Sequence, residues 1–205
     1  MMIVASLLLA LLLPPLPDLK DGAGLKADHF ISPTANWVVP GRLLQGDSKL
    51  DGAKDDTFLC ALQVEDPPAD AHLFYPIKNG EPAHDLTTFS ALVVSLVGRV
   101  RAGETPVYVT CPDGLSQSGI VSACLMALLY ELGAEEALAR VDAYCATRGA
   151  GLASPATDAQ REQVQQVIRN FRGDLVPLAV LGHGIKFAPE VAVPMMFENR
   201  PVARR

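Results

Sequence analysis

Residues 106–133 read PVYVTCPDGLSQSGIVSACLMALLYELG, and they carry the strongest indication of how the chain folds. Residues 106–110 are rich in β-branched and aromatic side chains, which predicts a buried strand. Residues 119–132 are apolar nearly all round and stop before Gly133, which predicts a buried helix. The loop between them therefore lies at the carboxyl end of a strand, where ligands bind in α/β sheets.

The loop from Cys111 to Ser118 has the layout of an anion-binding site. Its backbone N–H groups have no partner in a strand ladder or in a helix, and a loop that curls them inward favours a bound anion. The same field favours thiolate, so we expect a lowered pKa for the Cys111 thiol. From these residues alone, the alternative is that Cys111 is a buried structural thiol.

The stretch Val107–Gly119 resembles the signature loop of the cysteine-dependent tyrosine and dual-specificity phosphatases. In that loop a histidine and the nucleophilic cysteine are followed by five residues, an arginine, a serine or threonine, and a glycine. Residues 36–46, 74–77 and 154–171 are similar, in the same order, to other parts of these proteins. The likeness covers about residues 33–172.

The resemblance implies a single α/β domain with a central sheet and helices on both faces. It implies Cys111 as the nucleophile, with Ser118 helping the thiolate to leave in the second step. It also implies that the phosphate-binding loop consists of Pro112, Asp113, Gly114, Leu115, Ser116 and Gln117. Gly114 would supply a backbone angle that a side chain forbids. An N-cap is the alternative role for Ser118, and we expect the Asp113 carboxylate to point outward into solvent.

Three positions depart from the family pattern. Thr110 stands for the histidine, Gln117 for the phosphate-clamping arginine, and Asn79 for the aspartate that acts as general acid. Gln117 has neither the charge nor the planar fork of arginine, so it cannot grip two phosphate oxygens. Asn79 cannot give a proton to a leaving alkoxide. The resemblance therefore predicts an impaired enzyme.

Other carboxylates near residue 79 are alternative acids. Glu81, Asp85 and the pair Glu65–Asp66 all lie within reach in the sequence. For Asp85 we expect a different role, as the N-cap of a helix over residues 86–101. Glu65 and Asp66 have the character of solvated turn residues.

Composition narrows the class of protein. A chain of 205 residues that is 49% hydrophobic can bury one substantial core, and its net charge of −6 has no basic block for nucleic acid. Cysteines 60, 111, 124 and 145 have no Cys-x-x-Cys spacing and do not cluster with the histidines, so no metal site and no cofactor are expected. Reduced, buried thiols favour a cytoplasmic location.

The pattern divides the chain into three parts. Residues 1–32 are an apolar segment and lead-in, 33–173 the phosphatase-like domain, and 174–205 a proline-containing extension. The domain is predicted to hold strands at 37–45, 57–64, 73–77 and 106–110, and helices at 86–101, 119–132, 135–147 and 157–172. Residues 1–13 are too short to span a bilayer. A docked helix, a degenerate signal or membrane-surface anchor, and an upstream start-site artefact all remain open for them.

Together these observations predict a pseudophosphatase that binds phosphorylated proteins, other phosphorylated ligands or protein partners. The alternative is an active phosphatase that works through a phosphocysteine at Cys111. A thiol redox or sensing role for Cys111 is a third possibility, and it depends on a low thiol pKa.

Overall fold

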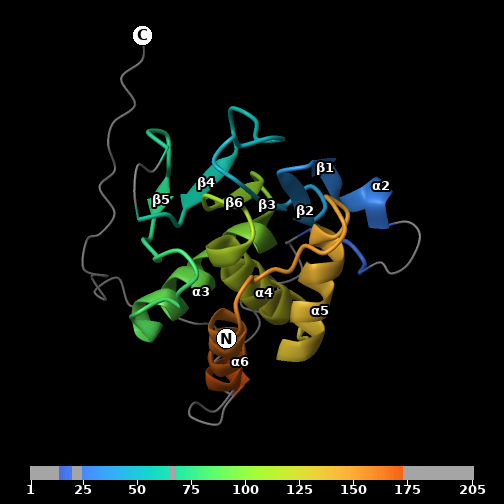
Figure 1. Ribbon diagram of the computed structural model, residues 1–205. Coiled ribbons are helices and arrows are strands. Elements are labelled where there is room, and N and C mark those ends of the chain that lie inside the picture. Colours follow the sequence, from blue (N-terminus) through green and yellow to red (C-terminus); the bar gives the residue numbers. More distant parts are fainter. Residues whose placement is uncertain (1–13, 20–24, 65–67, 173–205) are drawn as a thin grey trace, which may run out of the picture.

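The computed structural model describes residues 14–19, 25–64 and 68–172, and the segments predicted at 1–13 and 174–205 lie outside this range (Figure 1). Its elements in chain order are α2 (Leu25–His29), β1 (Phe30–Ser32), β2 (Ala35–Val39), β3 (Leu43–Gly46), β4 (Phe58–Ala61), β5 (Leu73–Phe74), α3 (Leu86–Ala102), β6 (Val107–Thr110), α4 (Ser116–Tyr130), α5 (Ala134–Cys145) and α6 (Asp158–Arg172).

The six strands form one mixed sheet in the order β1-β2-β3-β6-β4-β5. Strands β3, β6, β4 and β5 are parallel, whereas β1 and β2 join antiparallel at one edge. Thr110, at the end of β6, pairs with Gly46 of β3 on one side and with Ala61 of β4 on the other. The loop that begins at Cys111 therefore leaves the middle of the edge where three strands end.

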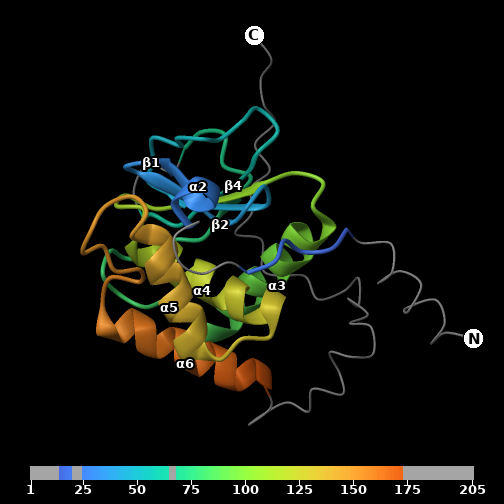
Figure 2. The same cartoon turned by 90° about the vertical axis from the view of Figure 1, so that its right-hand side faces the viewer.

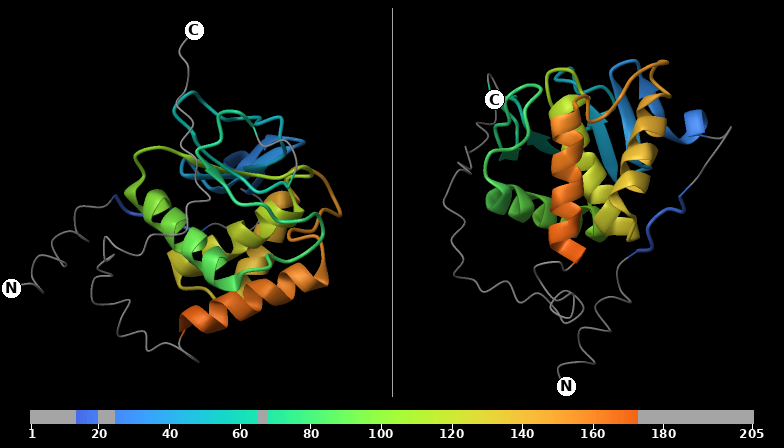
Figure 3. Two further views of the ribbon diagram at one scale, coloured as in Figure 1. Left: turned by 90° about the vertical axis from the view of Figure 1, so that its left-hand side faces the viewer. Right: turned by 60° about the horizontal axis from the view of Figure 1, so that its bottom comes forward.

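The α/β fold with one central sheet is confirmed, and among the described residues the helices lie on one face of that sheet and not on both. Helices α3, α4, α5 and α6 gather on one face, as all views show (Figures 1, 2 and 3). The small core on the other face is formed by Ala35, Leu44, Leu59 and Tyr108, and the residues that pack against it come from strands and connecting loops. The described parts of the connections 47–57 and 62–72 form no helix, so loops cover this face.

Helix α4 occupies the centre of the helical layer. It packs against α3, α5, α6 and strand β6, and thirteen of its fifteen residues are buried. This position explains why its sequence is apolar all round. The helix ends at Tyr130, where Glu131 takes the left-handed cap with a φ of 58°, and Gly133 caps the start of α5 instead. The predicted stop at Gly133 is therefore two residues late.

Two other expectations change in detail. The predicted strand 37–45 is two strands, β2 and β3, because the chain reverses at Pro40 and Gly41, where Gly41 has a φ of 72°. The segment before residue 33 contributes α2 and β1, so the sheet takes in part of the predicted lead-in.

The four cysteines are all buried and free of disulfides, as predicted. Within the described ranges, no single helix combines the length and the apolar composition that crossing a bilayer requires; only α4 and α5 together meet both, across a bend of 120°.

Candidate functional site

The loop between β6 and α4 is a tight cradle, and its shape depends on Gly114. This residue has a φ of 64°, in the left-handed region, as expected from the sequence. A Cβ atom there would lie 2.5 Å from the backbone nitrogen of Asp47 and 2.6 Å from the carbonyl carbon of Gly46. Gly114 thus lets the loop pack directly against the end of β3.

Three side chains from distant parts of the chain hold the outer side of this loop. Gln45 Nε2 donates to Gly114 O at 3.1 Å and to Ser154 Oγ at 2.7 Å. Arg148 donates to Gly114 O at 2.8 Å, and Ser154 Oγ donates to Leu115 O at 2.8 Å. We call Gln45, Arg148 and Ser154 the loop clamp.

The loop clamp sets the direction of the peptide groups. The C=O and N–H of one trans peptide point in opposite directions. Because the carbonyls of Gly114 and Leu115 are held outward, the N–H groups of Leu115 and Ser116 turn inward, as an anion-binding loop requires. No local sequence pattern marks these clamp residues, since positions 45, 148 and 154 come together only in the folded chain.

Cys111 lies at the floor of the cradle and is fully buried. Its Sγ is 3.2 Å from Asp113 Oδ1 and 3.2 Å from Ser118 Oγ, and the Ser118 N–H donates to it at 3.4 Å. Helix α4 begins at Ser116, so Ser118 lies inside the first turn and is not the N-cap. Ser118 therefore contacts the thiol from the helix side.

The expectation of a lowered thiol pKa at Cys111 is wrong. Burial raises the pKa of Cys111 to about 11, and the negative charge of Asp113 adds to this effect. The hydrogen bonds from Ser118 act in the opposite direction but are outweighed. At neutral pH the sulfur is therefore a protonated thiol, which is a poor nucleophile.

We expected the Asp113 carboxylate to point outward into solvent, but it turns back onto the loop. The residue is exposed, but its Oδ1 accepts hydrogen bonds from the N–H groups of Leu115 at 2.8 Å and Ser116 at 2.9 Å. Its Oδ2 accepts the hydroxyl hydrogen of Ser116. Burial opposes ionisation of this carboxyl, but the hydrogen bonds from Ser116, Leu115 and Cys111 prevail and hold its pKa below the ordinary value. A charged carboxylate therefore lies on the inward N–H groups.

The Gln117 side chain makes a structural hydrogen bond between helix α4 and the β5–α3 connection. Its side chain is buried, and Nε2 donates to the carbonyl of Ile77 at 3.2 Å. Its Oε1 is buried with no hydrogen-bond partner among the described residues. The N–H of Ile77 in turn donates to Leu62 O at 2.8 Å. Gln117 thus ties the segment before residue 79 to the start of α4. Thr110, another of the three departures from the family pattern, is fully buried at the end of β6.

Of the candidate acids near residue 79, Glu81 and Asp85 have lowered pKa values and do not hold a proton at neutral pH. Asn79 follows Ile77 by two residues and lies exposed in a turn. The pKa of Glu81 is lowered, first by a hydrogen bond from Lys78. Asp85 caps α3 by accepting from the N–H groups of Thr87 and Thr88, as predicted, and its pKa is lowered as well. Glu65 and Asp66 lie outside the described residues.

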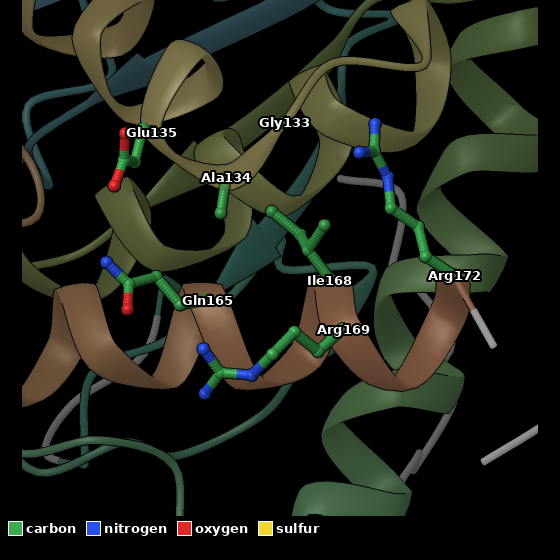
Figure 4. A pocket seen from close by; sticks show the side chains of 7 residues that line it. All are labelled: Gly133, Ala134, Glu135, Gln165, Ile168, Arg169 and Arg172. Carbon is green, nitrogen blue, oxygen red and sulfur yellow. The ribbon is translucent and has the colours of Figure 1, made fainter. Parts of the chain in front are cut away.

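A separate cavity of about 470 Å³ lies at the other end of α4. It is lined by Gly133, Ala134, Glu135, Gln165, Ile168, Arg169 and Arg172, from the start of α5 and the last turns of α6 (Figure 4). Helix α4 is about 22 Å long at 1.5 Å per residue, so the cavity is remote from Cys111.

The α/β fold of the described residues is similar to that of solved tyrosine and dual-specificity phosphatases. No family model and no curated protein matches the chain. Solved structures do match it. Tk-PTP in its active form is 19% identical with a TM-score of 0.52, and the match covers 67% of this chain and 97% of that one.

Two further structures support the same fold. Human DUSP28 is 21% identical with a TM-score of 0.53, over 69% of this chain and 96% of that one. A mouse protein described as a dual specificity phosphatase, solved with zinc tungstate, is 19% identical with a TM-score of 0.50, over 77% and 94%. The predicted resemblance is thus confirmed at the level of the fold.

Proposed function

We propose that this chain is a catalytically impaired phosphatase-like protein that acts by binding phosphorylated ligands or protein partners. The observation that carries the proposal is the state of Gln117, whose amide is committed to the Ile77 carbonyl and offers the cradle no positive charge. The fold of the phosphatases is present, and so is the inward-facing loop. The groups that would drive turnover have been replaced.

Each step of phosphoryl transfer lacks a group that it needs. Attack on phosphorus requires a thiolate at Cys111, but the raised pKa keeps this sulfur protonated. Charge that develops on the phosphoryl oxygens would meet Gln117 instead of a guanidinium, and the loss of such a donor commonly lowers the rate by about 100- to 1,000-fold. The leaving oxygen would meet Asn79, and the loss of a general acid costs about 100- to 10,000-fold. Efficient hydrolysis is therefore not expected.

What remains favours a binding role. The loop clamp keeps the cradle in shape, and Gly114 retains the backbone angle of the loop. The similar mouse phosphatase was solved with tungstate, an oxyanion. A loop of this shape can recognise an oxyanion or present a rigid surface to a partner without any chemistry at the thiol.

The test is turnover of a small aryl phosphate, whose good leaving group makes a general acid nearly dispensable. We expect the wild-type protein and Cys111→Ser to release product at the same background rate. Gln117→Arg is expected to raise release above that rate, because it restores a bidentate cation, whereas Gln117→Lys, with charge but no fork, should do so less. Wild-type release that disappears in Cys111→Ser would overturn the proposal in favour of an active phosphatase.

A further inference from the structure

The inward N–H groups of the loop already have an anionic partner within the chain. Leu115 and Ser116 both donate their backbone N–H to Asp113 Oδ1, and Ser116 also donates its hydroxyl to Oδ2. The Gly114 N–H donates to the carbonyl oxygen of Cys111 at 3.2 Å. The donors that would face a bound oxyanion are therefore occupied by a carboxylate.

The same carboxylate lies against the thiol. Asp113 Oδ1 is 3.2 Å from Cys111 Sγ, and the thiol has no exposed surface. A phosphoryl group bound in contact with Cys111 would need the space and the hydrogen-bond donors that Asp113 now uses. It would also bring a second negative charge to within a few ångströms of the first.

Among the residues that the structure describes, no cation contacts the inner side of the loop to offset this charge. The Arg148 guanidinium contacts the loop from the outer side and donates to the carbonyls of Gly114 and Pro33. The position that would supply an inner cation is Gln117, which is neutral and bonded to Ile77. Among the described contacts of the loop, the charge on its inner side is therefore the negative charge of the Asp113 carboxylate.

We propose that Asp113 is the specificity-determining residue of the cradle, acting as a built-in anion that keeps free oxyanions out at neutral pH. This inference rests on the proposed function and deepens it. It separates the two proposed binding roles. The wild-type loop would bind protein partners, or those ligands that can displace the Asp113 carboxylate. Free inorganic phosphate would not do so.

The experiment measures binding of inorganic phosphate to the full chain at neutral pH, by calorimetry and by the shift in melting temperature. Asp113→Asn keeps the size of the side chain and an oxygen that accepts from Leu115 and Ser116, but removes the charge. We expect it to bind phosphate at least about tenfold more tightly than the wild type, with Asp113→Ala as a second variant that also vacates the donors.

Asp56→Asn is the matched control. Asp56 is exposed and precedes β4, whereas the cradle lies at the carboxyl end of the sheet, so this variant changes net charge by the same unit at the opposite edge. It should bind phosphate as the wild type does. A gain in Asp56→Asn equal to that in Asp113→Asn would mean that net charge, not the cradle, sets the affinity, and would overturn the proposal.

Two other outcomes would also overturn it. Equal phosphate affinity in the wild type and Asp113→Asn would show that the carboxylate excludes nothing. Failure of both Asp113 variants to bind, while circular dichroism shows them folded, would show that Asp113 is not what keeps oxyanions out. Neither result depends on turnover, so failure here is distinguishable from failure of the proposed function, which the aryl phosphate assay decides.

Discussion

At the scale of single residues, the balance between thiol and thiolate at Cys111 depends on its neighbours more than on its place in the loop. A helix N-terminus favours thiolate. Full burial and a carboxylate at 3.2 Å favour the thiol, and they prevail. The sequence shows the helix start and the aspartate, but it does not show that the aspartate turns inward.

This balance gives a prediction for the titration of Cys111. The difference in ultraviolet thiolate absorbance between the wild type and Cys111→Ser should rise with an apparent pKa near 11. The same difference, measured in an Asp113→Asn background, should show a lower pKa, because a nearby negative charge that opposes thiolate has been removed. An apparent pKa at or below the ordinary value of 9.0 in the wild type would contradict the described site and would revive a redox role for the thiol.

The residues that departed from the family pattern were recognisable from the sequence, but their new contacts were not. Position 117 could be read as glutamine in place of arginine. That its amide would bond the Ile77 carbonyl, forty residues earlier, depends on how the β5–α3 connection packs against α4. The same limit applies to the loop clamp, whose members Gln45 and Ser154 are 109 residues apart.

At the scale of elements, helices were predicted better than strands. Helix α3 occupies Leu86–Ala102 against a predicted 86–101, because a clear N-cap at Asp85 and a left-handed Gly103 delimit it. The strands are two to five residues long, so one turn at Gly41 was enough to divide a predicted strand. The face that the helices cover depends on the connections between strands, and hydrophobic periodicity does not reveal it.

Two glycines in helices should respond oppositely to alanine. A Cβ at Gly119 of α4 would lie 2.3 Å from Ser154 Oγ and 2.8 Å from the nitrogen of Pro155, so Gly119→Ala should destabilise the protein by about 1–3 kcal/mol. A Cβ at Gly98 of α3 would meet nothing within 4 Å. Gly98→Ala should therefore stabilise it by about 0.5–1 kcal/mol.

Urea unfolding followed by circular dichroism measures both changes. Because Gly98→Ala is the matched control for helix propensity, its gain separates the intrinsic effect of alanine from the steric effect at Gly119. If Gly119→Ala stabilised the protein as much as Gly98→Ala does, the close packing of α4 against residues 154–155 would be contradicted.

At the scale of the whole molecule, the buried thiols couple stability to alkaline pH. Burial raises the pKa of Cys60 to about 12 and that of Cys145 to about 11, from an ordinary 9.0, and Cys111 shifts in the same direction. The folded state therefore holds these protons more tightly than the unfolded chain does. The stabilisation is complete below pH 9 and is lost as pH rises from about 9 through the folded-state values.

We expect the free energy of unfolding, measured by urea titration, to fall above pH 9. Each raised thiol contributes at most about 1.4 kcal/mol per pH unit within its window. Cys60→Ala should make the fall in the free energy of unfolding with pH less steep, by the contribution of one thiol. A free energy of unfolding that stayed level from pH 8 to pH 11 would show that the thiols are hydrated in the folded protein.

The loop clamp makes this domain a suitable scaffold for engineering. Gln45, Arg148 and Ser154 hold the loop by hydrogen bonds to its carbonyl oxygens, so its backbone path does not depend on a bound ligand. A designer who wished to awaken hydrolysis in this chain would leave the scaffold untouched. Only the charged and neutral side chains inside the loop, at positions 113 and 117, would need to change.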